Sequence, residues 1–273
     1  MPELPEVETV RQVLRTKILN KKITNVKVLY DGIIKDDEVS IFINKITNQT
    51  INEIERKGKY LFFMLDDCVL ISHLRMEGKY FLKDPSDKVN VHEHVLITLG
   101  DIELRYHDVR KFGTMQIRSK DELFTTNPIL KLGMEPLTDD FTYEKLKKII
   151  RVRKKIKTFL LEQEHICGIG NIYADEICFL SNLHPEQVLT NITDEDIMNI
   201  YNATNTVIKK AVADGGTTIR SYTSSLGVTG RFQLHLNVHQ RVNKECKKCG
   251  TTIIKTKVSG RGTYICTNCQ KIK

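Results

Sequence analysis

Apolar positions along the chain follow two different periods, and the change separates an N-terminal part from a C-terminal part. Residues 3–19 predict an amphipathic helix, because Val7, Val10, Val13, Leu14 and Ile18 recur at spacings of three and four. Residues 23–118 then predict short strands, the clearest over 60–65, 69–74, 95–99 and 102–106. Gly100 and Asp101 between the last two are typical of a two-residue hairpin turn. Short strands with tight turns favour a β-sandwich or a barrel.

Helical spacing replaces this pattern after residues 132–140, which are typical of a linker. Helices are predicted over 143–155, 157–163 and 194–213, the last with Thr193 and Asp196 as a capping pair and a double glycine as its stop. Gly168–Tyr173 predicts a tight turn that leads into a further helix near Asn171, whose free N–H groups could hold a phosphate. Strands followed by helices predict an α+β protein.

The charge distribution points to a polyanionic partner. The 273 residues carry a net charge of +8, and residues 241–273 account for all of it, with nine Lys or Arg and one acid. Residues 145–157 hold eight basic side chains and no acid. Both segments favour nucleic acid, although a solvated helix face explains 145–157 equally well. No apolar stretch approaches the roughly 18 residues of a membrane helix and no secretory signal is evident, so a cytoplasmic protein without membrane contact is expected.

The seven cysteines fall into two groups. Three are scattered and are interpreted as buried free thiols: Cys68, Cys167 and Cys178. The others form C-x2-C, sixteen residues, then C-x2-C, a spacing typical of a zinc site: Cys246, Cys249, Cys266 and Cys269. A disulfide framework is the alternative, which the expected compartment disfavours. The last 33 residues are too few for a core of their own, so a metal would stabilise them.

The second residue is the strongest candidate for chemistry. If Met1 is removed, Pro2 becomes a secondary amine beside Glu3 and Glu6. An N-terminal amine has a pKa near 7.7–8.0 against about 10.4 for lysine, so far more of it is neutral and nucleophilic at pH 7. The alternative is that Pro2 and Pro5 only shape the start of the helix.

Two loop tips carry side chains suited to entering a base stack. Met76 and Phe112 each lie after a predicted strand, the first beside His73 and the second beside Arg110. Core packing is the alternative for Met76 and Phe112. Arg261 is expected at the tip of the zinc hairpin, within reach of a groove or a phosphate.

Taken together, these segments resemble the formamidopyrimidine-DNA glycosylase family of bifunctional base-excision repair enzymes. The matching segments run along the whole chain: MPELPEVET at the start, SHLRMEGKY at 72–80, DVRKFGT at 108–114, GIGNIYADE at 168–176, GGTTIRSY at 215–222 and VSGRGTYIC at 258–266. The resemblance implies a catalytic β-sandwich over 1–131 with flanking helices, and a linker over 132–141. A helix–two-turn–helix domain over 142–231 with a lesion-capping loop at 214–231, and a zinc finger over 232–273, would follow.

The resemblance also implies roles for individual residues. Pro2 would attack the deoxyribose C1′, Glu3 would transfer protons, Glu6 would support the site, and Lys59 would contact a phosphate and assist elimination. Met76, Arg110 and Phe112 would fill the gap left by the flipped nucleotide, with Arg110 facing the orphaned cytosine. Further DNA-binding residues would be His73, Lys157, Asn171 and Arg261. The loop over the flipped base would include Gly216, Thr217, Thr218, Arg220, Ser221 and Tyr222.

The resemblance implies a monomeric bacterial enzyme, nucleoid-associated when bound, that removes 8-oxoguanine and formamidopyrimidines from damaged duplex DNA. It would cleave the strand by β,δ-elimination, with one structural zinc ion and no organic cofactor. One departure is His239, where the family often has Tyr; if this side chain contacts a phosphate, affinity would rise at lower pH. Two alternatives are an endonuclease VIII-type glycosylase for oxidised pyrimidines, whose opening has Gly where this chain has Leu4, and a non-catalytic zinc-dependent DNA-binding protein.

Overall fold

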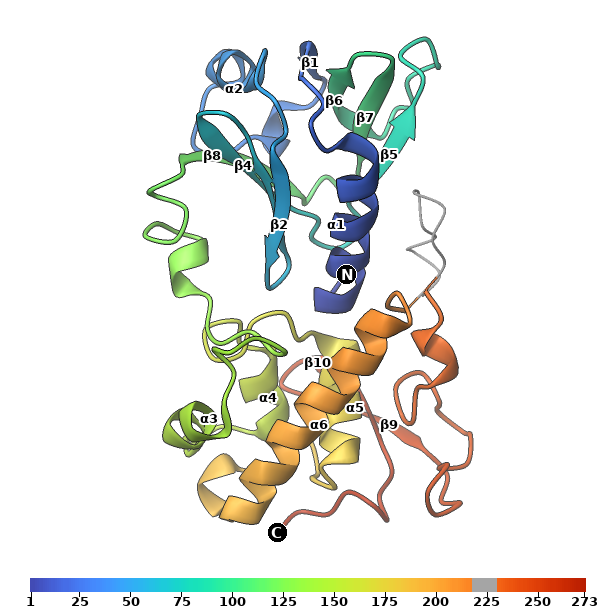
Figure 1. Cartoon of the computed structure of the whole chain (residues 1–273). Coiled ribbons are helices and arrows are strands. Elements are labelled where there is room, and N and C mark those ends of the chain that lie inside the picture. The colour runs from blue at the N-terminus through green and yellow to red at the C-terminus, as the bar shows by residue number, and fades with distance from the viewer. Residues whose placement is uncertain (218–229) are drawn as a thin grey trace. The chain divides into compact units, whose positions relative to one another are not determined.

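The computed structural model describes residues 1–217 and 230–273, which divide into two compact units (Figure 1). The first unit contains residues 1–130 and the segment 215–230, of which 215–217 and 230 are described. The second contains residues 131–214 and 231–273. The N-terminal strands therefore belong to one unit, and the C-terminal helices share the other with the cysteine-rich hairpin.

Two four-stranded antiparallel sheets form the first unit. One has the order β1 (Asn25–Val28), β6 (Glu93–Leu99), β7 (Ile102–His107) and β5 (Lys79–Lys83). The other has the order β2 (Glu53–Lys57), β3 (Tyr60–Met64), β4 (Cys68–His73) and β8 (Thr114–Ser119). Buried apolar residues of both sheets form one core, which confirms the sandwich, and Leu99 pairs with Ile102 across the expected hairpin.

Helix α1 (Leu4–Ile18) packs against β2 and covers this core with Val7, Val10, Leu14 and Ile18, as the apolar spacing predicts (Figure 1). Helix α2 (Val39–Ile46) lies in a region predicted as strands, and that prediction is wrong there. Val39, Ile41 and Ile43 alternate as in a strand, whereas Phe42 and Ile46 are the buried residues and lie one helical turn apart. A segment of eight residues is too short for the apolar pattern to distinguish a helix from a strand.

The second unit contains the helices α3 (Tyr143–Ile150), α4 (Ile156–Leu161), α5 (Asn171–Leu180) and α6 (Asp194–Ala213), and the hairpin β9 (Ile254–Val258) and β10 (Arg261–Ile265). Helix α6 has the predicted bounds, and its capping box of Thr193 and Asp196 is present. The helix predicted over 143–155 ends at Ile150. Four cations in the next five residues repel one another along a helix, and Lys155 instead bridges to Val188.

Short 3-10 helices complete the described chain: η1 (Asp31–Ile33), η2 (Ile129–Lys131), η3 (Leu189–Asn191) and η4 (Phe232–Leu234). Within residues 1–217 and 230–273, no helix combines the length and the apolar character needed to cross a bilayer.

Candidate active site

The start of helix α1 brings three predicted site residues together, Pro2, Glu3 and Glu6. Pro2 is buried, and so are Glu3 and Glu6, at 2% and 4% exposed. The backbone N–H of Glu3 donates to Oε2 of Glu6 at 2.8 Å, and the Glu3 side chain accepts from the Glu6 backbone N–H in a capping box. The residue that follows Pro2 is thus fixed by two reciprocal hydrogen bonds.

The second carboxylate oxygen of Glu6 holds the entry to the predicted lesion loop. Oε1 of Glu6 accepts from the Thr217 backbone N–H at 2.7 Å and from the Thr217 hydroxyl at 3.1 Å. Gly216 has φ +77, and a Cβ there would lie 2.6 Å from the same oxygen, so only glycine allows this approach. The Glu6 carboxylate therefore hydrogen-bonds to Glu3 and Thr217, with Gly216 packed against it. The predicted loop residues Thr218, Arg220, Ser221 and Tyr222 lie outside the described residues.

Lys59 and His73 lie close together at one end of the second sheet. Lys59 follows Gly58 in the β2–β3 turn and is buried, while its neighbour Tyr60 pairs with His73 and packs edge-on against the imidazole at 4.4 Å. Nδ1 of His73 accepts from the Arg75 backbone N–H at 2.9 Å. Burial, then the charges of Arg75 and Lys59, lower the pKa of His73 to about 3. His73 is thus a neutral imidazole with its proton on Nε2.

Substituting His73 with Asn is expected to flatten the acid dependence of stability. The pKa of His73 is depressed in the fold, so its contribution to stability is full above the ordinary value of 6.5 and is lost as pH falls toward 3. Between pH 7 and pH 5 this loss amounts to about 2 kcal/mol. Urea unfolding at the two pH values measures it, and a variant with the same pH dependence as the wild type would contradict the assignment.

The predicted wedge residues project from two loops. Met76 is 37% exposed and Phe112 is 52% exposed, so the core-packing interpretation is wrong for both. The guanidinium of Arg110 lies 4.7 Å from the centre of the Phe112 ring. Arg75 and Lys111, each next to a wedge residue, have φ of +51 and +56, an unfavourable conformation for residues other than glycine. Such strain is typical of functional loops.

Asp108, which sequence reasoning missed, organises the second of these loops. This buried carboxylate accepts from the backbone N–H groups of Arg110 at 3.0 Å, Phe112 at 3.0 Å and Gly113 at 2.8 Å. The Tyr106 hydroxyl lies beneath both loops, because a Cβ on Gly113 would approach it to 1.6 Å and one on Gly78 to 2.3 Å. Asp108 thus holds the second wedge loop by hydrogen bonds, and the Tyr106 hydroxyl packs against both wedge loops.

Asp108→Ala is expected to disorganise this loop. One buried and two partly buried N–H groups lose a charged acceptor, which costs about 3 kcal/mol of unfolding free energy. Cleavage of damaged duplex should fall about tenfold or more, because Arg110 and Phe112 are no longer held. Asp101→Ala, on the exposed β6–β7 hairpin, is the matched control. Equal stability and activity of the two variants would contradict this role.

Lys157 does not fit the direct DNA contact expected of it. Its side chain is fully buried, and Nζ donates to Oδ1 of Asp175 at 2.6 Å, to the Gly262 carbonyl at 3.0 Å and to the Thr263 hydroxyl at 2.8 Å. All three of its donors are thus used inside the second unit. Lys157 joins α4 and α5 to the zinc hairpin, so its role is to position that hairpin.

The basic run over 145–157 is largely neutralised by acids from other parts of the second unit. Lys147 and Arg151 both pair with Asp194, and the same is true of Lys154 with Glu162 and Lys155 with Glu186. Lys145 pairs with Asp140. The alternative, a solvated charged surface, is therefore the better interpretation of this segment.

Asn171, Arg261 and His239 have separate environments in the second unit. The Asn171 amide donates to the Gly262 carbonyl at 3.0 Å, and Arg261 is exposed at the start of β10. His239 is buried, with Nδ1 2.7 Å from Oδ2 of Asp175 and its ring against Tyr264. Glu176 accepts from the backbone of residues 237–239. Two adjacent acids, at 175 and 176, on a mostly apolar helix are the sequence signal that could have predicted these buried partners.

The four predicted metal ligands form a cluster at the base of the hairpin. Their sulfur atoms all lie within 4.8 Å of one another, including pairs at 3.4 Å (Cys249–Cys266) and 3.9 Å (Cys246–Cys269). Four sulfurs at about 2.3 Å from a tetrahedral zinc lie about 3.8 Å apart, so the set fits this ion. A hydrogen bond with Thr251 is the main cause that lowers the pKa of Cys249 to about 5. Cys68, Cys167 and Cys178 are buried free thiols, as expected.

Three family models match the chain and together cover most of it. They describe a formamidopyrimidine-DNA glycosylase N-terminal domain at residues 1–115, an H2TH domain of the same glycosylase at 132–223 and a zinc finger found in FPG and IleRS at 243–272. Formamidopyrimidine-DNA glycosylases of Shouchella clausii and Bacillus licheniformis are 44% and 45% identical to this chain over 99% of its length. The matches cover 99% and 100% of the length of these two relatives. The chain belongs to the formamidopyrimidine-DNA glycosylase family.

Solved structures of formamidopyrimidine-DNA glycosylase (Fpg) agree. Lactococcus lactis Fpg in complex with abasic-site DNA superposes with a TM-score of 0.94 at 39% identity, covering 98% of this chain and 99% of that one. A mutant of the same enzyme, bound to DNA containing Fapy-dG, superposes with a TM-score of 0.94 at 39% identity. The match covers 99% of this chain and 100% of the mutant chain. The α+β fold with a cysteine-rich zinc-finger hairpin is therefore that of the Fpg family.

Proposed function

We propose that this chain is a DNA glycosylase and AP lyase that removes oxidised purines from duplex DNA with Pro2 as its nucleophile. The observation that carries the proposal is the start of helix α1, where Glu6 fixes both the residue after Pro2 and the entry to the lesion loop. A binding protein needs no such arrangement around an amine.

The chemistry follows from these positions once Met1 is removed. The neutral Pro2 nitrogen attacks C1′ of the damaged nucleotide, the C1′–base bond breaks, and the N–H proton of the amine passes to the departing base with the help of Glu3. A proton from Glu3 to the sugar ring oxygen then opens the ring by breaking its bond to C1′. The product is a cationic iminium. Because its nitrogen carries no hydrogen, this iminium cannot become neutral by losing an N–H proton, and it continues to acidify C2′.

Elimination then cuts the strand. Loss of a C2′ proton from the iminium expels the 3′ phosphate, and a second elimination expels the 5′ phosphate. Lys59 would contact a phosphate and assist this step, and the neutral His73 would donate Nε2–H to a phosphate without changing its charge between pH 5 and pH 8.

The wedge residues account for access to the lesion. A base inside the duplex hides its glycosidic bond, so it must be extruded, at a cost of a few kcal/mol. Met76, Arg110 and Phe112 would occupy the vacated stack, and Asn171 and Arg261 would hold phosphates. One structural zinc ion on the four cysteines would hold the hairpin, without an open position for a catalytic water. The enzyme would act as a monomer in the bacterial cytoplasm, at the nucleoid.

Substrate preference tests the proposal against its nearest rival. Duplexes with 8-oxoguanine opposite cytosine should be nicked faster than duplexes with thymine glycol. A Lactococcus lactis Fpg structure holds DNA containing an oxidised pyrimidine, so both substrates belong in the assay. A preference for thymine glycol would favour the endonuclease VIII-type alternative, and damage-independent binding without any nicking would favour a DNA-binding protein.

A further inference from the structure

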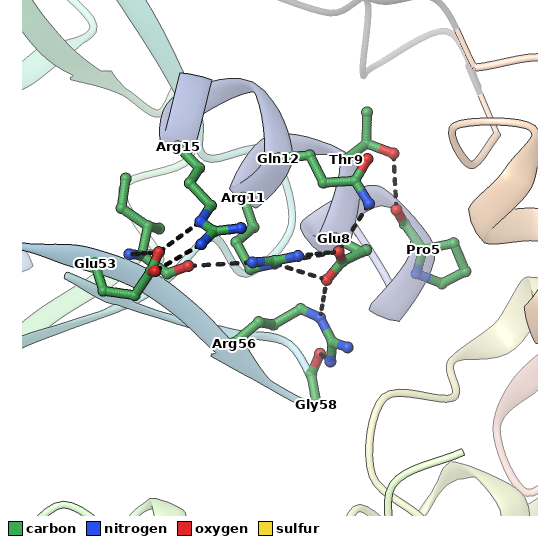
Figure 2. A network of polar contacts seen from close by, with 10 residues as sticks. Pro5, Glu8, Thr9, Arg11, Gln12, Arg15, Glu53, Arg56 and Gly58 are labelled. Atoms are coloured by element: carbon green, nitrogen blue, oxygen red, sulfur yellow. Dashed lines mark hydrogen bonds and ion pairs between the residues drawn. The ribbon is translucent and has the colours of Figure 1, made fainter. Parts of the chain in front are cut away.

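Helix α1 and the turn that carries Lys59 are joined by a partly buried ion network centred on Glu8 (Figure 2). Arg11 donates to both oxygens of Glu8, with Nη2–Oε1 2.6 Å and Nε–Oε2 3.0 Å, and Gln12 adds a bond to Oε1 at 2.9 Å. Nε of Arg56, at the far end of β2, donates to Oε2 at 3.0 Å. Although burial opposes ionisation, the Arg11 and Arg56 bonds lower the pKa of Glu8.

Arg56 bonds to the turn as well as to the helix. Its Nη1 donates to the carbonyl of Gly58 at 3.1 Å, the peptide that leads directly to Lys59. Gly58 has φ +58, so the turn uses a left-handed residue at this point. A planar guanidinium can hold two acceptors at a fixed angle, which the ammonium of a lysine cannot do. The turn therefore has a defined position relative to the helix.

The first turn of helix α1 and the residues just before it carry Pro2, Glu3 and Glu6, and Glu8 lies within the next turn. We propose that Arg56 is a positioning residue that, through Glu8 and the Gly58 carbonyl, sets the Lys59 amine relative to the Pro2 nucleophile. The inference rests on the proposed function. It accounts for a charged pair between α1 and β2 with only 11% of each side chain exposed, where an apolar contact would avoid the cost of desolvation.

The same helix and strand offer a matched control. Arg15 of α1 donates to both oxygens of Glu53 at 2.7 and 2.8 Å, two turns further from Pro2 (Figure 2). This pair is more exposed, at 49% and 33%, and Glu53 lies at the opposite end of β2 from the turn. It tests the effect of removing an α1–β2 ion pair without touching the Lys59 turn.

Single-turnover cleavage of a preformed abasic site, measured in a double-mutant cycle, tests the proposal. Arg56→Gln and Arg56→Lys should each slow cleavage about tenfold or more, whereas Arg15→Gln should stay within about twofold of wild type. In a Lys59→Gln background, Arg56→Gln should cost less than about twofold further. This last measurement separates positioning from a merely structural role, which would slow both backgrounds equally.

Two outcomes would overturn the proposal. One is an equal cost of Arg56→Gln with and without Lys59. The other is wild-type activity of Arg56→Gln at wild-type thermal stability. Wild-type protein that fails to cleave abasic DNA at all would instead refute the proposed function, so the two failures are distinguishable.

Discussion

Pro2→Gly is expected to reduce strongly the covalent enzyme–DNA adduct that borohydride traps, and to slow strand cleavage on the order of a thousandfold or more. Glycine keeps an α-amine but loses the ring that fixes its φ and the secondary nitrogen that keeps the iminium cationic. A Schiff base on a primary amine can lose its proton and become neutral, which removes the driving force for loss of the C2′ proton. Gel electrophoresis of the reduced reaction measures the adduct.

A chain with one uncleaved residue joined to Pro2 is the complementary variant. It keeps every side chain of the site but turns the Pro2 nitrogen into an amide, which is not nucleophilic. It should bind damaged DNA and form no adduct. An adduct that survives both changes would indicate a lysine nucleophile, for which Lys59 is the first candidate to substitute.

Loss of the metal is expected to unfold the hairpin and to abolish DNA binding. Structural zinc contributes about 10–16 kcal/mol to the folding of small zinc domains, and the hairpin core here is a small set: Phe179, Val238, Cys246, Ile253 and Cys266. Cys266→Ala, which removes a buried ligand of that core, should lower affinity for abasic-site duplex at least about a hundredfold. Fluorescence anisotropy measures binding, and atomic absorption measures zinc per chain.

The exposed Lys271→Ala is the control for charge loss in the same segment. Because the β-sandwich has its own core, calorimetry of Cys266→Ala should still show an unfolding transition for the first unit. A variant that lacks zinc but binds DNA as tightly as wild type would contradict a structural role for the metal in binding.

Periodicity and spacing predicted the elements that are long or governed by local chemistry. Helix α6 has an uninterrupted apolar stripe and its own capping box, and the cysteine spacing alone predicts the metal cluster. The eight residues of helix α2 fit two periods, and the helix from Tyr143 ends at Ile150, before four cations in five residues that repel one another along a helix.

Motifs identified site residues, but their partners depend on contacts between distant segments. The sequence predicts Lys157 as a DNA-binding cation, whereas burial against Asp175 and the hairpin gives it a different role. Glu8 and Arg56 bind each other across 48 positions of the chain, whereas Asp108 binds backbone N–H groups two to five residues away through the shape of its loop. The partners of a charged residue are set by the folded structure, so the pattern of a single sequence does not predict them.

Mass spectrometry of the borohydride-reduced adduct on 8-oxoguanine duplex tests the central claim most directly. The account predicts an N-terminal peptide that begins at Pro2, lacks Met1 and carries the deoxyribose remnant on the proline nitrogen. A remnant on a lysine side chain, or efficient nicking by protein that keeps Met1, would contradict it.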